Sequence, residues 1–243
     1  MDCIPKSCLL LDRYWSSYWP FPRGKGLFCR VLDWCSRLGI ARPGWREYNG
    51  LALWLDPANY MSRCLLGTGE YQVEVSGAIV NSLPAGGTFV DVGANVGYMS
   101  MLAARKAGAN GRVYAFEPCP RLADALRRHL TRNRISNVTV IQAGCSDAAG
   151  VLPLFVAAEG NLGKTSLSAE NAHSSTAVSV EVAPLDDLLA AQDPARVDVI
   201  KIDVEGAELQ VLQGARETLR RFRPIIIMEL DRGKSHLCEL PDL

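Results

Sequence analysis

The sequence predicts an α/β fold in which helices cover both faces of a parallel, doubly wound sheet. From residue 88 onward, short apolar runs alternate with longer amphipathic segments, the pattern of strand–helix–strand units with right-handed crossovers. The apolar runs are nearly continuous, as is typical of strands covered on both faces. Hydrophobic residues make up 48% of the 243 residues, which is enough for a buried core.

Five strands and three helices are expected in this region. Each strand is a short apolar run, and the helices between them carry their apolar residues on one face. The expected strands are Thr88–Val92, Arg112–Phe116, Val138–Gln142, Val197–Ile202 and Pro224–Leu230, and the expected helices are Gly97–Ala107, Pro120–Asn133 and Gly206–Phe222. A polar loop over residues 157–179 interrupts this order, and Val151–Val156 and Val178–Val182 beside it are further strand candidates.

The first quarter of the chain differs from the rest, because it holds all five tryptophans. An amphipathic helix is expected at Leu27–Leu38 and a strand at Leu51–Leu55. The helix either covers the sheet of the main domain, which is the interpretation we favour, or forms an arm for a partner or a membrane surface. We therefore predict an N-terminal extension over residues 1–64 and the α/β domain over residues 65–243.

Charge and cysteine content indicate the setting in which the protein works. Lys plus Arg and Asp plus Glu each number 26, so no overall field draws the chain to nucleic acid or anionic lipid. The eight cysteines show no CxxC pair and no zinc-ligand spacing, and we expect free thiols in a reducing compartment. No apolar run reaches the roughly 18–20 residues of a membrane span, and the N-terminus is a poor signal peptide. We expect a cytoplasmic protein without a nucleic-acid partner.

A glycine-rich turn is the main functional signal. It runs from Asp91 to Gly97, between the first strand of the domain and the next helix, where doubly wound sheets bind ligands. Gly93, Asn95 and Gly97 form a G-x-N-x-G pattern instead of the G-x-G-x-x-G of dinucleotide sites. The acid at Asp91 suits a ligand with an amino group and a sulfonium, and it repels phosphates. Glu117 ends the second strand about twenty residues later, where an acid can accept both hydroxyls of a ribose.

Three segments closely resemble the FkbM-type methyltransferase family. They are Phe89-Val-Asp-Val-Gly-Ala-Asn-Val-Gly-Tyr98, Gly111-Arg-Val-Tyr-Ala-Phe-Glu-Pro118 and Asp198-Val-Ile-Lys-Ile-Asp-Val-Glu-Gly-Ala-Glu208. The resemblance implies a class I, Rossmann-like fold with S-adenosyl-L-methionine as the methyl donor. It also implies methylation of a hydroxyl, commonly on a sugar or a polyketide-like natural product. The expected donor-binding residues are then Asp91, Gly93, Asn95, Gly97 and Glu117.

Further acidic residues are candidates for catalysis and for binding the adenine of the donor. An alcohol acceptor has to lose a proton, and Asp203 is the first candidate base, followed by Glu205 and by His173 in the polar loop. Asp203, Glu205 and Glu229 can instead hold a divalent cation that acidifies the acceptor hydroxyl. Asp147 follows the third strand, where class I enzymes contact the base, and an Asx-turn is the equal alternative for it.

The C-terminal segment departs from the family pattern. Residues 233–243 leave no room for the antiparallel hairpin that completes the family's seven-stranded sheet, so the last strand is expected at an exposed edge. A homodimer or the N-terminal arm can cover that edge. The leading hypothesis is an O-methyltransferase for a small-molecule hydroxyl acceptor. The alternatives are a truncated module that binds the donor without catalysis and an NAD-dependent dehydrogenase, which the turn spacing disfavours.

Overall fold

The computed structural model describes residues 30–31, 34–35, 38, 40–69, 71–156, 176–204 and 206–228, and these form two compact units. One unit holds the described residues up to Val73, and the other holds those from Glu74 onward. The candidates His173, Glu205 and Glu229 and most of the helix expected at 27–38 lie outside the described residues. The domain boundary expected after residue 64 stays a prediction.

The smaller unit contains a two-stranded hairpin and a helix. β1 (Gly44–Tyr48) and β2 (Leu51–Leu55) pair antiparallel around Asn49-Gly50, and both turn residues have positive φ, as the right-handed twist of a tight hairpin requires. The three leucines of β2 alternate inward and are buried. α3 (Tyr60–Thr68) follows. The strand expected at Leu51–Leu55 is confirmed, whereas β1 and α3 were not expected.

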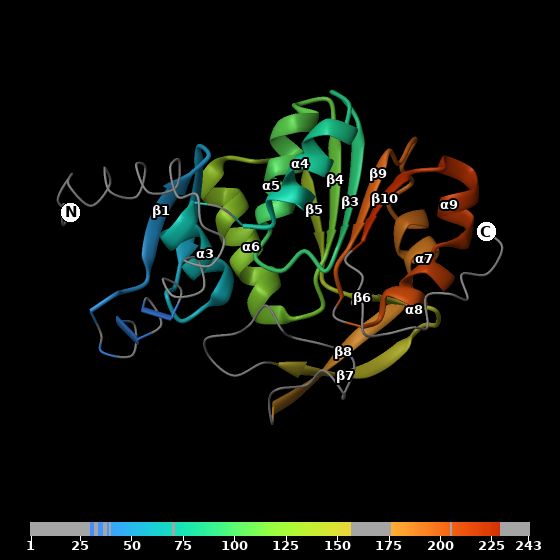
Figure 1. The fold of residues 1–243 in the computed structure, drawn as a ribbon. Helices are drawn as coiled ribbons and strands as arrows, with labels where there is room; N and C mark the ends of the chain where they lie inside the picture. Colours follow the sequence, from blue (N-terminus) through green and yellow to red (C-terminus); the bar gives the residue numbers. More distant parts are fainter. Residues whose placement is uncertain are drawn as a thin grey trace. The chain divides into compact units, whose positions relative to one another are not determined.

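The larger unit is built on a parallel sheet of five strands in the order β10-β9-β3-β4-β5 (Figure 1). The strands are β3 (Thr88–Val92), β4 (Arg112–Phe116), β5 (Val138–Ile141), β9 (Val199–Ile202) and β10 (Ile225–Met228). β3 and β4 have the expected bounds, and the other three lie within theirs. β4 and β5 lie on one side of β3, and β9 and β10 lie on the other, which makes the sheet doubly wound. The predicted class I, Rossmann-like fold is confirmed.

Helices cover both faces of this sheet (Figure 1). On one face lie α4 (Val73–Ser82), α5 (Tyr98–Ala107) and α6 (Pro120–Asn133), and on the other lie α7 (Leu185–Ala190), α8 (Glu208–Gln213) and α9 (Arg216–Phe222). Side chains alternate between the faces along each strand. Val90 and Val92 belong to the core cluster that contains Leu185 of α7, whereas Asp91 between them contacts Ser100 of α5.

The single helix expected at Gly206–Phe222 is wrong, because the structure divides it into α8 and α9. A Cβ on Gly214 would lie 2.0 Å from the carbonyl oxygen of Ser146, so the glycine allows another strand to approach the backbone at this point. Asp186 then begins α9 separately, since its carboxylate accepts hydrogen bonds from the backbone N–H groups of Glu217 and Thr218. A tertiary contact therefore ends one helix and starts the next.

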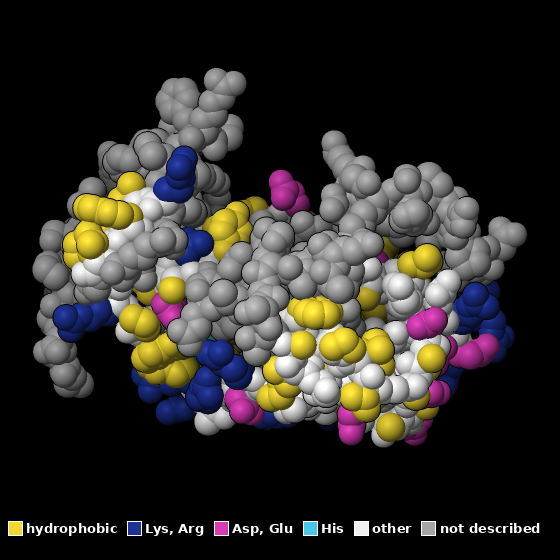
Figure 2. Space-filling model, turned by 90° about the horizontal axis from the view of Figure 1, so that it is seen from below, with side chains coloured by type: hydrophobic (Ala, Val, Ile, Leu, Met, Phe, Trp, Pro, Cys, Tyr) yellow, Lys and Arg dark blue, Asp and Glu magenta, His cyan; other side chains and the backbone are white. Residues whose placement is uncertain are grey.

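A second, three-stranded sheet has the order β6-β8-β7. Its strands are β6 (Gly144–Ser146), β7 (Gly150–Val156) and β8 (Thr176–Pro184). The two strand candidates beside the polar loop are confirmed as parts of β7 and β8, and the three-residue β6 was not expected. Hydrophobic side chains reach the surface of the face seen in Figure 2, and Val151, Leu152 and Val178 of this sheet are exposed.

β10 lies at the edge of the five-stranded sheet, as expected for the last strand in the described part of the chain. Ile225 is 51% exposed and Ile226 37% exposed there. Residues 229–243 lie outside the described residues, and the homodimer expected to cover this edge stays a prediction. None of the helices in the described ranges has the length and apolar character needed to cross a bilayer.

Candidate functional site

The site lies where the strand order of the five-stranded sheet reverses. β3 pairs with β4 on one side and with β9 on the other. The chain leaves the end of β3 toward α5 on one face of the sheet, and it leaves the end of β9 toward α8 on the other face (Figure 1). Such a switch point leaves a crevice at the carboxyl ends of the strands, where doubly wound sheets bind their ligands. The glycine-rich turn follows β3 and Asp203 follows β9, which brings two of the predicted elements together.

The turn from Gly93 to Gly97 depends on three residues with positive φ. The angles are 78° at Gly93, 54° at Asn95 and 86° at Gly97. A Cβ at Gly93 would lie 2.0 Å from the carbonyl oxygen of Asp203, and one at Gly97 would lie 1.9 Å from Leu126 Cδ1 of α6. Both positions therefore need glycine for the backbone conformation, and Gly93 needs it also because the backbone of Asp203 approaches so closely.

The five backbone N–H groups of the turn all donate within the protein. Those of Gly93 and Ala94 donate to the carbonyl of Phe116, and that of Gly97 donates to the carbonyl of Ala94. The N–H of Asn95 donates to Glu117 Oε2 at 2.7 Å, and that of Val96 to the side chain of Asn95. A pyrophosphate site offers free N–H groups to its anion, and this turn keeps none of the five free for that purpose.

A buried ion pair lies beneath the turn. Asp91 and Lys201 are direct partners in the β3–β9 register, and both side chains are at most 5% exposed. Asp91 Oδ2 accepts a 2.5 Å hydrogen bond from Ser100 Oγ, and Oδ1 forms an ion pair with Lys201 Nζ at 3.2 Å. Lys201 Nζ donates to the carbonyl of Gly93 at 2.9 Å. Burial lowers the pKa of Lys201, but the charges of Asp91 and Asp203 outweigh it and raise that pKa above its usual value.

Glu117 lies beside the turn, at the end of β4, and is 4% exposed. Its Oε2 accepts from the N–H of Asn95, and its Oε1 accepts from the N–H of Cys119 at 2.8 Å. Burial raises the pKa of Glu117 to about 7, although these two hydrogen bonds and the charge of Lys201 lower it. The carboxylate is thus held rigidly, and each oxygen retains lone pairs for a ligand.

Asp203 is the acid of the site that reaches the surface, with 23% of its side chain exposed. Its N–H donates to the carbonyl of Val92 at 3.1 Å, and its Oδ2 lies 3.6 Å from Lys201 Nζ. Glu208 at the start of α8 accepts from the N–H of Gly206 and so closes the turn after Asp203. Within the described ranges, no three His, Cys, Asp or Glu side chains gather as ligands for a metal ion.

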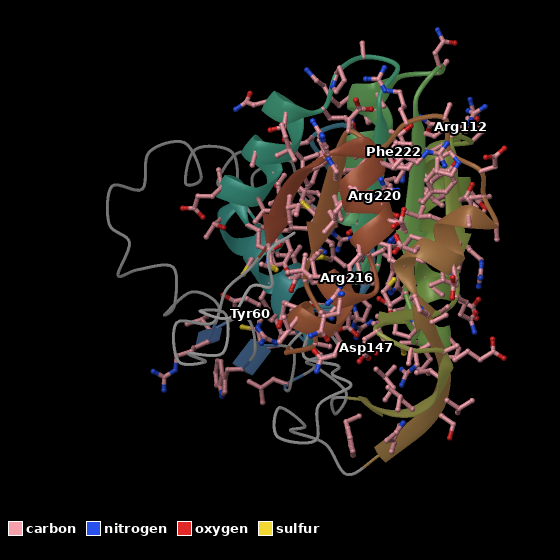
Figure 3. All side chains as sticks on the ribbon, turned by 90° about the vertical axis from the view of Figure 1, so that its right-hand side faces the viewer. Tyr60, Arg112, Asp147, Arg216, Arg220 and Phe222 are labelled. Atoms are coloured by element: carbon pink, nitrogen blue, oxygen red, sulfur yellow. The ribbon has the colours of Figure 1, made fainter. Side chains whose placement is uncertain are left out.

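Asp147 was expected to follow the strand that is now β5, but it does not follow that strand directly. β6 intervenes, and Asp147 follows that strand as an exposed residue whose Oδ1 accepts from Ser146 Oγ at 3.1 Å. Figure 3 shows Asp147 near the opposite end of the sheet from Arg112, the first residue of β4. Asp147 is therefore on the side of the strand carboxyl ends, and its contact with an adenine stays a prediction.

The sequence reasoning missed Ser100 and His129, and it placed Lys201 beside Asp203 at the strand end without giving it a role. His129 of α6 is 2% exposed and its Nδ1 lies 2.8 Å from the carbonyl oxygen of Val96, so it supports the turn from a third side. Burial lowers the pKa of His129 and keeps the ring neutral. A signal for the role of Lys201 was present, because Asp91 in β3 and Lys201 in β9 are opposite charges in two otherwise uncharged, buried strands.

The comparison with protein families agrees with this geometry. The family of the methyltransferase FkbM domain matches residues 91–242, from the turn to nearly the end of the chain. The chain belongs to the FkbM methyltransferase family. The matched region contains Asp91, the whole turn, Glu117 and the segment from Lys201 to Glu208, so these residues of the site lie within the part of the chain that matches the family.

Three methyltransferases show how far the similarity extends. Methyltransferase sdnD of Sordaria araneosa is 35% identical over 57% of this chain and 64% of its own length. The hexuronic acid methyltransferase AglP of Haloferax volcanii is 30% identical over 59% of this chain and 55% of its own length. The 31-O-demethyl-FK506 methyltransferase FkbM of Streptomyces tacrolimicus is 32% identical over 56% and 62%. The chain thus spans less than two thirds of the length of each.

Proposed function

We propose that this chain transfers the methyl group of S-adenosyl-L-methionine to a hydroxyl of a small-molecule acceptor. The observation that carries the proposal is the meeting of the Gly93–Gly97 turn with Glu117 on one side and Asp203 on the other, at the switch point of the sheet. Membership of the FkbM methyltransferase family supports the same reaction. Asp91, Gly93, Asn95, Gly97 and Glu117 are the residues we assign to the donor.

The residues of the site fit a donor that bears an ammonium, a sulfonium and a ribose. Asp91 is buried beneath the turn, where its Oδ1 is paired with Lys201 Nζ at 3.2 Å, so its negative charge acts on the donor through the turn. Glu117 has lone pairs left for ribose hydroxyls. Among the described residues of the site, the carboxylates of Asp91 and Asp203 both pair with Lys201, and their excess of negative charge over this one ammonium favours a positively charged ligand.

The chemistry divides between the donor and the chain. The donor supplies a methyl carbon that the sulfonium already activates for displacement. The chain has to align the acceptor oxygen with that carbon, and alignment contributes up to roughly 7–11 kcal/mol in well-oriented reactions. Asp203 is the base we propose for the acceptor proton, because it is partly exposed at the strand end whereas Asp91 is fully buried. Glu205 is the second candidate.

A sugar or a natural product is the acceptor class we propose. AglP is described as a hexuronic acid methyltransferase, and the FkbM protein as a 31-O-demethyl-FK506 methyltransferase, and both share about a third of their residues with this chain over the matched regions. The zero net charge of the chain also fits a small acceptor better than a nucleic acid. Asp147 is our candidate for the adenine of the donor.

Calorimetric titration tests the donor and a transfer assay tests the reaction. We expect S-adenosylhomocysteine to bind and NAD not to bind, because the turn has no free N–H group for a pyrophosphate. NAD binding without S-adenosylhomocysteine binding would refute the proposal. Incubation with methyl-labelled donor and a panel of sugars and hydroxylated metabolites should then label an acceptor. Tight donor binding without transfer to any acceptor would instead indicate a binding module without catalysis.

A further inference from the structure

Lys201 connects more parts of the site than any single candidate base does. Its Nζ donates to the carbonyl of Gly93 in the turn, pairs with Asp91 on β3 and lies 3.6 Å from Asp203 after β9. The side chain is 5% exposed, although lysine is almost never buried without partners. These contacts join the two strands that flank the switch point.

The position of the ammonium explains why a cation is needed there. Asp91 is fully buried, and a buried carboxylate without a counter-charge is costly. The carbonyl of the partly buried Gly93 accepts a hydrogen bond from the same ammonium at 2.9 Å, and losing that donor would cost free energy. One ammonium has three N–H donors and meets both needs at once. An apolar side chain of similar length meets neither.

We propose that Lys201 is a positioning residue that preforms the turn for the donor by holding the Gly93 carbonyl and by balancing Asp91. The proposal rests on the proposed donor binding. It assigns Lys201 no contact with the donor or the acceptor. Its action is indirect: backbone hydrogen bonds hold Gly93 to Phe116 and Asp203 to Val92, and the ammonium adds the side-chain contacts that join Gly93, Asp91 and Asp203 to one another.

A stability role alone and a positioning role predict different results for paired substitutions. Lys201→Met leaves Asp91 charged and buried, so it should lower the midpoint of thermal unfolding. Asp91→Asn with Lys201→Met removes both charges and should bring the midpoint back close to that of Asp91→Asn. The Gly93 carbonyl still lacks its donor in the double variant, so affinity for the donor should not return.

The measurement is the dissociation constant of S-adenosylhomocysteine by calorimetry, at a temperature where unfolding curves show every variant to be folded. We expect the double variant to bind at least tenfold more weakly than Asp91→Asn alone. Lys106→Met, at an exposed position on α5, is the matched control and should bind as the wild type does. Equal affinities of the double variant and Asp91→Asn would overturn the positioning role.

A pH profile provides a second readout, and it uses Glu117. Glu117 faces Asp91 on β3, Lys201 on β9 and the Cys119 thiol, and the charge of Lys201 lowers the pKa of Glu117. Donor affinity should rise with pH as Glu117 ionises, and the midpoint of that rise should lie at higher pH in Lys201→Met than in Lys106→Met. An unshifted midpoint would count against the proposal. If the wild-type protein binds no S-adenosylhomocysteine, the proposed function is refuted. If the wild type binds it and the double variant binds as tightly as Asp91→Asn, only the positioning role of Lys201 is refuted.

Discussion

Replacing Gly93 by alanine separates the geometry of the turn from its general stability. Gly93 has a φ of 78°, a conformation that costs an L side chain roughly 1–2 kcal/mol. The new Cβ would also lie 2.0 Å from the carbonyl oxygen of Asp203, whereas real Cβ contacts begin near 3.0 Å. Gly86→Ala is the matched control, because Gly86 has a φ of 73° and its Cβ would meet nothing closer than 4.0 Å.

The two substitutions share the backbone strain, so the difference between them measures the contact with Asp203. Overpacking of a buried site costs about 1–3 kcal/mol. Gly93→Ala should therefore lower the free energy of unfolding by about 2–5 kcal/mol, and Gly86→Ala by about 1–2 kcal/mol. Because Asp203 has to move by about 1 Å, and a misplacement of that size can reduce catalysis ~100-fold, transfer should fall further than stability alone explains.

Urea unfolding and calorimetric titration with S-adenosylhomocysteine check this prediction. The expected result for Gly93→Ala is the larger loss of unfolding free energy together with at least tenfold weaker binding. Gly86→Ala should bind within about twofold of wild type, since its backbone strain lies away from the turn. Equal losses of stability in the two variants, with wild-type affinity in both, would refute the assignment of Gly93 to close packing beneath the donor.

Three further substitutions test other parts of the site. Burial raises the pKa of Glu117 from 4.5 to about 7, so the contribution of Glu117 to the free energy of unfolding should decline as pH rises through that range. Glu117→Gln should remove this decline in urea unfolding series and weaken donor binding at least tenfold; an unchanged pH profile would contradict the burial argument. Asp203→Asn should slow labelled methyl transfer about 10²–10⁴-fold, with donor affinity within about threefold, if Asp203 is the base. Wild-type turnover would exclude it. Ser100→Ala leaves Asp91 Oδ2 without its donor and should cost about 1–3 kcal/mol in unfolding experiments, more than Ser76→Ala on α4.

The order of strands and helices in the α/β domain was predictable from local pattern. Buried parallel strands read as continuous apolar runs, and a helix such as α6 shows its apolar face at every third or fourth residue. The break between α8 and α9 was not predictable, because the segment is helical in pattern throughout. Gly214 ends α8 where Ser146 of β6 approaches, and the three residues of β6 are too few to show a strand pattern in the sequence.

The candidate site was predictable to the extent that it depends on residue type at a strand end. The turn, Glu117 and Asp203 all follow apolar strands, so their meeting at one edge follows from the fold class. The support beneath them was not predicted. Ser100 and His129 are ordinary helix residues until packing brings them against Asp91 and Val96.

The amino-acid sequence alone determined the five strands of the parallel sheet, the helices α5 and α6 and the glycine-rich turn, because periodicity and φ preference are local properties. Tertiary structure decided which strands became neighbours. Asp91 and Lys201 are 110 residues apart in the chain, and they form a buried pair only because β9 lies beside β3 in matching register. A pairing of that kind depends on how the sheet is assembled as a whole, and neither strand carries the information by itself.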